Sequence, residues 1–259
     1  MAKVLSFANE KGGVGKTTSA LSLGAALAET GERILLMDLD PQANLTLALG
    51  FEPSSLTLTM ADVLLGNRPL AEIIQPTDVA NLDLAPASDS LLNAERFLPV
   101  RQHFELVLRQ ALESVDGYAM TILDCPPALG ATTRCALAAS DILIIPTQCE
   151  YFSAYALRQV VRLIRNIRQR SNPALRYRLL LTMLDRRNGL HRSLAEQIRR
   201  AFGGAVFASE IEIDARLREA PVFGQPITEY APSSRGALQY RQLASELREH
   251  AQETVAPAA

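Results

Sequence analysis

The chain has 259 residues, a hydrophobic fraction of 48% and a formal net charge of −2. This length suits one large α/β domain or two small ones, and the hydrophobic fraction is that of an ordinary globular protein. No apolar run approaches the ~20 residues that a membrane-spanning helix needs, and the apolar stretch near Met1 is too short for a signal peptide. We therefore expect a cytoplasmic protein.

Apolar runs alternate with helical patterns along the chain. A short apolar run at 3–9 precedes a helical pattern over 17–30, which Gly31 closes. Later apolar runs lack strict alternation, as is typical of strands that are buried on both faces of a parallel sheet. These runs lie at 33–40, 118–127, 141–147 and 177–184, and helices are expected at 102–114, 154–170 and 190–202.

The alternation predicts a doubly wound α/β fold, with a mostly parallel sheet and helices on both faces. Residues 50–100 contain five prolines and are expected to form an irregular excursion with one or two short helices. We expect a single domain over 1–250 and a frayed tail over 251–259.

The charge is distributed unevenly. Residues 151–250 contain 17 arginines, no lysine and nine acidic residues, a formal balance of +8, so the remainder carries about −10. This asymmetry favours a polyanionic partner, with solvated helix faces as the alternative. The three cysteines show no C-x-x-C spacing, which favours reduced core residues over a disulfide or a metal site.

A glycine-rich loop, "KGGVGKTT" (11–18), lies between the first predicted strand and helix. It resembles the phosphate loop G-x-x-x-x-G-K-[ST], except that Glu10 stands where that pattern has glycine. Glycines let successive backbone N–H groups point at phosphate oxygens, beside a helix N-terminus. Lys16 is expected to reach the β- and γ-phosphates, Thr17 to ligate Mg²⁺ and Thr18 to bond the α-phosphate. The predicted nucleotide-binding residues are Lys11, Gly12, Gly13, Val14, Gly15, Lys16, Thr17 and Thr18.

Lys11 is a second positive charge in this loop, five residues before Lys16. Because Lys16 already occupies the intramolecular position, a lysine on the outer rim would gain most from a phosphate supplied across an interface. A solvated surface lysine explains the residue equally well.

Three aspartates end predicted strands, where ligands bind in open α/β sheets. Asp124 is expected to hold Mg²⁺ through water. Asp38 and Asp40 end the second strand, and Asp38, on the opposite pleat face, is expected to help set the loop. "DCPPALG" (124–130) supplies two prolines and a glycine, which suit a segment that changes shape with the γ-phosphate.

Arginines are the candidate DNA contacts, because the guanidinium fork suits phosphates. No zinc-finger, homeodomain or helix-turn-helix spacing is visible, so we expect salt-dependent binding to the DNA backbone without sequence preference. Arg158, Arg162 and Arg165 share one face of a predicted helix. The predicted DNA-binding residues are Arg192, Arg199, Arg216, Arg218, Arg235 and Arg241.

The chain resembles the ParA/Soj family of partition ATPases, within the ParA/MinD class that carries a deviant Walker A motif. The resemblance rests on "KGGVGKTT" and on blocks along nearly the whole chain. These are "LLMDLDPQANLTLALG" (35–50), "TILDCPPALG" (121–130), "IIPTQCEYFSAYAL" (144–157) and "RLREAPVFGQPI" (216–227).

The resemblance implies slow, partner-stimulated ATP hydrolysis with Mg²⁺. Lys11 would reach the γ-phosphate of the partner subunit in an ATP-sandwiched homodimer, so Lys11, Lys16 and Asp40 form the catalytic set. Asp40 would position the attacking water and lie near Mg²⁺, giving Thr17, Asp40 and Asp124 as metal residues, although a helix-capping role for Asp40 is the alternative. The dimer would bind double-stranded DNA on the nucleoid until a ParB-like partner stimulates hydrolysis.

One departure from the family bears on DNA binding. Relatives often have Pro-Arg-Asn where this chain has Glu212, Ile213 and Asp214. Because of the added negative charge, the DNA contact is expected to lie at Arg218 or at the arginines of 158–165.

Alternative functions remain open from the sequence. One is a ParA-like positioner of a non-DNA cargo. A MinD-like membrane ATPase would need a basic amphipathic C-terminal anchor, and an iron–sulfur relative would need two cluster-bridging cysteines per subunit. The C-terminal segment is mixed in charge and the cysteines fit no such motif, so we expect no membrane partner.

Overall fold

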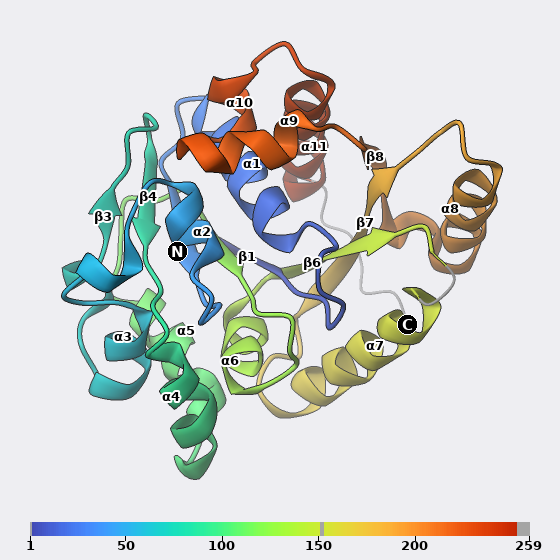
Figure 1. Ribbon diagram of the computed structural model, residues 1–259. Helices are drawn as coiled ribbons and strands as arrows, with labels where there is room; N and C mark the ends of the chain where they lie inside the picture. The colour runs from blue at the N-terminus through green and yellow to red at the C-terminus, as the bar shows by residue number, and fades with distance from the viewer. Residues whose placement is uncertain (1, 151–152, 253–259) are drawn as a thin grey trace.

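The strands form one eight-stranded sheet in a computed structural model that describes residues 2–150 and 153–252 (Figure 1). Their order is β3-β4-β2-β5-β1-β6-β7-β8, and every pair is parallel except β3 with β4. The strands are β1 (Lys3–Phe7), β2 (Ile34–Asp38), β3 (Gln75–Pro76), β4 (Leu82–Ala85), β5 (Met120–Asp124), β6 (Ile142–Gln148), β7 (Arg176–Leu184) and β8 (Val206–Glu212).

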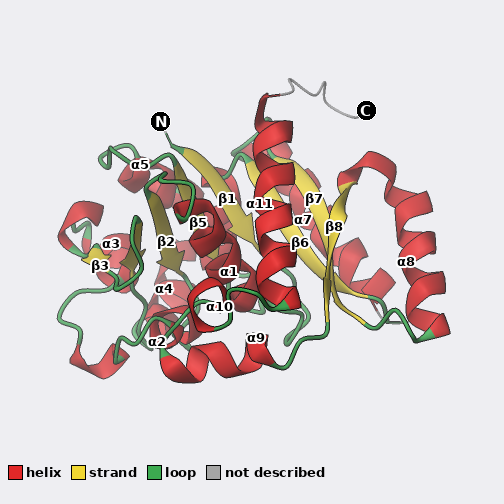
Figure 2. Cartoon of the chain, turned by 90° about the horizontal axis from the view of Figure 1, so that it is seen from above, coloured by secondary structure: helices red, strands yellow, loops and turns green. Residues whose placement is uncertain are grey.

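Helices cover both faces of this sheet (Figure 2). On one face lie α3 (Met60–Gly66), α4 (Leu91–Phe97), α5 (Val107–Leu112), α6 (Ala131–Ala139), α7 (Ser153–Arg170) and α8 (Gly189–Phe202). On the other lie α1 (Lys16–Ala28), α2 (Asn44–Ala48), α9 (Arg216–Glu219), α10 (Ile227–Tyr230) and α11 (Arg235–Gln252). The predicted doubly wound α/β fold is confirmed.

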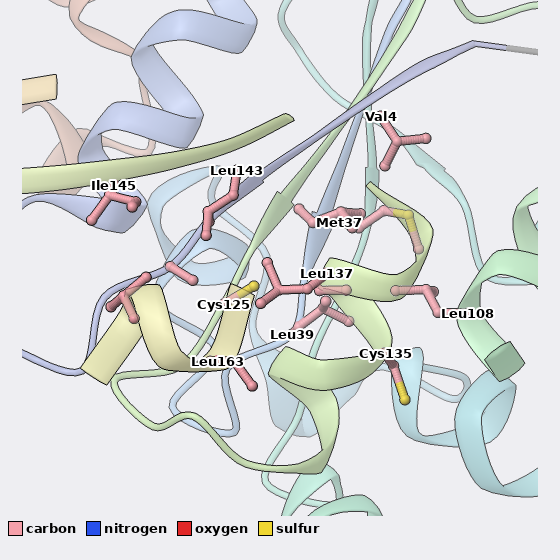
Figure 3. Close-up of a cluster of buried hydrophobic side chains, with 14 of the residues drawn as sticks. Val4, Met37, Leu39, Leu108, Cys125, Cys135, Leu137, Leu143, Ile145 and Leu163 are labelled. Carbon is pink, nitrogen blue, oxygen red and sulfur yellow. The ribbon is translucent and has the colours of Figure 1, made fainter. Parts of the chain in front are cut away.

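Two hydrophobic cores result, because successive strand residues point to opposite faces of a sheet. In β2, Leu35 and Met37 face the first core and Ile34 and Leu36 face the second. Figure 3 shows part of the first core, in which Met37 and Leu143 from the sheet lie near Leu137 of α6 and Leu163 of α7. The three cysteines are buried and free, as predicted for reduced core residues, and Cys125 and Cys135 lie in this core.

Residues 50–100 are more regular than predicted. They contain the two short α-helices that were expected, α3 and α4, but also β3 and β4, and β4 pairs with β2 inside the main sheet. The sequence analysis also missed β8. From Phe207 onward, buried residues of this edge strand alternate with exposed or half-exposed ones, whereas the prediction looked for continuous apolar runs.

The register of the sheet determines where the site forms. Phe7 at the end of β1 pairs with Asp124 in β5, and Asp124 pairs on its other side with Asp38 in β2. The predicted strand-end acids therefore meet beside the loop that follows β1. At the other end of the chain, α11 continues to Gln252, past the predicted boundary at 250, and 253–259 of the predicted tail lie outside the described residues.

Candidate functional site

The glycine-rich loop connects β1 to α1, and two neighbouring strands hold it in place. Gly13 and Gly15 have φ of 72° and 85°, a left-handed conformation that favours glycine. The Gln148 side chain in β6 donates to the Gly13 carbonyl at 3.0 Å, and the Thr182 hydroxyl in β7 donates to the Val14 carbonyl at 2.9 Å. Because the Gly13 and Val14 carbonyls are bound to β6 and β7, the loop conformation is fixed before an anion binds to its backbone N–H groups.

Lys16 is the first residue of α1, and its side chain is buried. Its ammonium donates a long hydrogen bond, 3.4 Å, to the Lys11 carbonyl. Burial lowers the pKa of Lys16, and the negative charges of Asp124 and Asp40 oppose this shift. The structure therefore presents a weakly solvated ammonium next to the loop, as the phosphate-binding prediction requires.

Asp124 is the buried carboxylate at the centre of the site. It is fully buried, and neither of its oxygens has a hydrogen-bond partner within the described part of the chain. Burial and the negative charge of Asp38 raise the pKa of Asp124 well above its usual range. The Thr17 hydroxyl and the Lys16 ammonium oppose that shift. A buried carboxylate with so few partners favours a nearby cation.

The surroundings fit a magnesium ion better than a metal with an all-protein ligand set. Within 2–150 and 153–252, no group of three His, Cys, Asp or Glu residues is arranged to hold a metal ion. Mg²⁺ usually retains several waters and binds through one or two carboxylates and the phosphates of a substrate. Thr17, Asp40 and Asp124 would supply oxygen ligands of this sparse kind.

Asp38 is a positioning residue. Its buried carboxylate accepts hydrogen bonds from the Asp40 backbone N–H at 3.1 Å, from the Thr46 backbone N–H at 2.9 Å and from the Thr46 hydroxyl at 2.8 Å. Burial raises the pKa of Asp38 to about 6, although these hydrogen bonds oppose the rise. The loop that carries Asp40 is therefore fixed by Asp38, as predicted. Asp40 itself accepts a hydrogen bond from the Gln42 backbone N–H at 2.9 Å.

Lys11 lies against its own chain. Its ammonium is 2.5 Å from the Glu150 carboxylate and donates to the Gln148 side-chain oxygen at 2.8 Å. The Lys11 side chain is 28% exposed and does not line the nucleotide cavity. In a single chain this lysine therefore has a local partner, and its action on a partner subunit stays a prediction.

A cavity of about 490 Å³ opens in front of the loop. Six of the predicted nucleotide-binding residues line it, together with Asp40, but Val14 is buried behind the loop. Pro127 of the predicted shape-changing segment also lines the cavity, with further residues to which the sequence analysis gave no role at the site: Leu21, Asn44, Leu47, Ala48, Met183, Pro221 and Val222. Pro221 and Val222 fall within the block at 216–227, to which no role was assigned. Met183 has φ of 53°, a conformation that the sequence did not indicate.

The six predicted DNA contacts differ in whether a carboxylate of the same chain already binds them. Three of the six are in salt bridges with their own chain: Arg199 with Glu210, Arg235 with Glu212 and Arg241 with Glu29, each at 2.7 Å. Arg192 is exposed and donates to the Arg186 carbonyl at 2.6 Å. Arg216 and Arg218 are exposed, and no salt bridge joins them to another described residue.

Comparison with known proteins identifies the family. A family model described as an AAA domain matches residues 2–177. The sporulation initiation inhibitor protein Soj of Bacillus subtilis is 42% identical over 249 residues, which cover 95% of this chain and 98% of that protein. The chain belongs to the ParA/Soj family of ATPases. The chromosome partitioning protein ParA of Caulobacter vibrioides is 40% identical over 249 residues, 95% of this chain and 93% of that protein.

Solved structures share this fold. Cobyrinic acid a,c-diamide synthase from Mycobacterium smegmatis with bound ATP analog and magnesium superimposes with a TM-score of 0.86 at 35% identity, over 98% of each chain. The septum site-determining protein MinD from Pyrococcus horikoshii, complexed with Mg-ADP, has a TM-score of 0.78 at 24% identity, over 98% of this chain and all of that one. The MinD likeness shows the fold alone. No described helix of this ParA/Soj family member is long and apolar enough to cross a membrane.

Proposed function

We propose that this chain is an ATP-dependent partition ATPase. It binds ATP with Mg²⁺, forms a homodimer around the nucleotide, and binds duplex DNA on the nucleoid without reading bases. A ParB-like partner then stimulates hydrolysis and release. The observation that carries the proposal is that one glycine-rich loop brings together the buried Lys16 ammonium and the buried Asp124 carboxylate, which has no hydrogen-bond partner among the described residues.

The phosphates of ATP and a magnesium ion have counterparts in the cavity. The loop amides and Lys16 would neutralise the phosphates, and Thr17 and Asp124 would hold Mg²⁺, which would supply positive charge for phosphoryl transfer. The bound ATP analog and magnesium of the M. smegmatis structure support this ligand pair.

Hydrolysis then depends on Asp40, which faces the cavity and whose loop Asp38 fixes. Little covalent chemistry is required of the protein, because phosphoryl transfer is catalysed mainly by positioning and charge neutralisation. Asp40 holds the attacking water. Pro126 and Pro127 follow Asp124 after Cys125, and Pro127 lines the cavity, so this segment is placed to respond to the γ-phosphate.

The experiment is an ATPase assay with and without duplex DNA and with the ParB-like product of a neighbouring gene. A low basal rate that rises when both are added supports the proposal. If the ATP-bound dimer ignores DNA at low salt, the partition function is wrong, and a ParA-like positioner of another cargo takes its place.

A further inference from the structure

The exposed face of α7 carries three arginines in a row. Arg158, Arg162 and Arg165 are separated by four and three residues, so they lie on one side of the helix, and all three are exposed. Val160 and Ile164 on the opposite side are buried in the first core. We call the three arginines the α7 stripe.

Among the described residues, no carboxylate neutralises the α7 stripe. The helix contains no aspartate or glutamate over Ser153–Arg170. Among the residues that the structure describes, no salt bridge reaches any arginine of the stripe. Arg199, Arg235 and Arg241, by contrast, already contact a carboxylate. A phosphate that approaches one of those three must displace the carboxylate or remain near a like charge, which reduces its net gain.

The position of α7 connects the stripe to the nucleotide loop. The helix begins three residues after Glu150, whose carboxylate is 2.5 Å from the Lys11 ammonium. Arg241 instead pairs with Glu29, beyond the far end of α1, which is about 20 Å long. In Figure 1, α7 and α11 lie on opposite faces of the sheet. A dimer that forms across Lys11 therefore brings two α7 helices to its boundary and leaves the α11 arginines away from it.

We propose that the α7 stripe is the principal contact surface for duplex DNA. This inference rests on the proposed function and specifies where its DNA binds. The stripe spans about 10 Å of helix, a length over which one DNA strand presents about three phosphates. None of the described α7 side chains is a large exposed hydrophobic residue. Protein interfaces and membrane-inserted helices rely on such anchors, so the stripe fits a polyanion better.

The test is a salt titration of binding to a labelled duplex of mixed sequence, with a non-hydrolysable ATP analogue present. Wild type is compared with the triple variant R158A/R162A/R165A. Two stripes in a dimer neutralise about six phosphates, so the slope of log K against log salt should decrease in magnitude by about 5. ATP-dependent dimerisation, followed by sedimentation, should remain.

The matched control is R68A/R96A/R109A, which removes the same charge from exposed positions near α3, α4 and α5. Its slope should equal that of wild type. If wild type binds DNA and the stripe variant keeps its slope, the inference is wrong and the proposed function stands. If wild type itself ignores DNA at low salt, both are wrong. If the variant keeps DNA binding but loses stimulation by the ParB-like protein, the stripe is a protein-docking surface and the DNA assignment is overturned.

Discussion

Replacing Asp124 by asparagine should stabilise the protein in the absence of Mg²⁺ and nucleotide. A buried ion costs several kcal/mol, and neither oxygen of Asp124 has a hydrogen bond to offset that cost. Asparagine keeps the shape and leaves a neutral unpaired amide, which costs about 1–3 kcal/mol. Because Lys16 compensates part of the charge, we expect a net gain of about 1–2 kcal/mol in the free energy of unfolding. For a chain of this size the melting temperature should rise by roughly 2–8 °C.

The stability gain of Asp124→Asn over wild type should increase with pH. The folded-state pKa of Asp124 is raised, so the folded state binds more protons than the unfolded state between the two pKa values. Wild-type stability therefore increases as pH falls through this window. The advantage of Asp124→Asn is full above the folded pKa and disappears below the unfolded value of about 3.9.

Urea unfolding at several pH values, without Mg²⁺ or nucleotide, measures this difference. Asp38→Asn is the matched control, because Asp38 is equally buried but accepts three hydrogen bonds. It should gain less than Asp124→Asn, because an asparagine amide cannot accept all three of these hydrogen bonds. With Mg²⁺ and ATP the order should reverse for Asp124→Asn, since the variant lacks the charge that the ion neutralises. A variant that is less stable than wild type without Mg²⁺ at pH 7 would refute the reasoning.

Three further substitutions test the other charges of the site. Lys16→Ala should weaken ATP binding by more than about 30-fold, measured by calorimetry, because losing one partner of a buried charge pair costs about 2 kcal/mol or more; unchanged affinity would remove Lys16 from the site. Asp40→Ala should retain ATP binding and lose at least about a hundredfold in turnover through a misplaced water, and wild-type turnover would contradict its role. Lys11→Ala in the Asp40→Ala background should bind ATP but sediment as a monomer, whereas equal dimer fractions would make Lys11 a surface lysine.

Local sequence determined the fold class and the centre of the site. The continuous apolar run "RILLMDLD" predicted a strand that is buried on both faces, and every residue of β2 is buried. The glycines of the phosphate loop predicted a backbone conformation that other residues rarely adopt, and Gly13 and Gly15 have positive φ. The strand-end acids were predictable because the carboxyl ends of parallel strands meet at one edge, and the register brings Asp38 and Asp124 side by side. The role of Asp38 was predictable from the alternation of side chains along a strand.

Tertiary structure alone decided which charges are available. Lys11 and Glu150 are 139 residues apart in the chain, and Arg241 and Glu29 are 212 apart, so no local pattern could show that these side chains pair. The cavity wall at Pro221 and Val222 is equally remote in sequence from the loop that it faces. Hydrophobic periodicity reports which face of an element is buried. The partner of an exposed charge depends on which surfaces the folded sheet brings together. That separates Arg199, Arg235 and Arg241, which form salt bridges, from the α7 stripe, which no salt bridge reaches within the described residues.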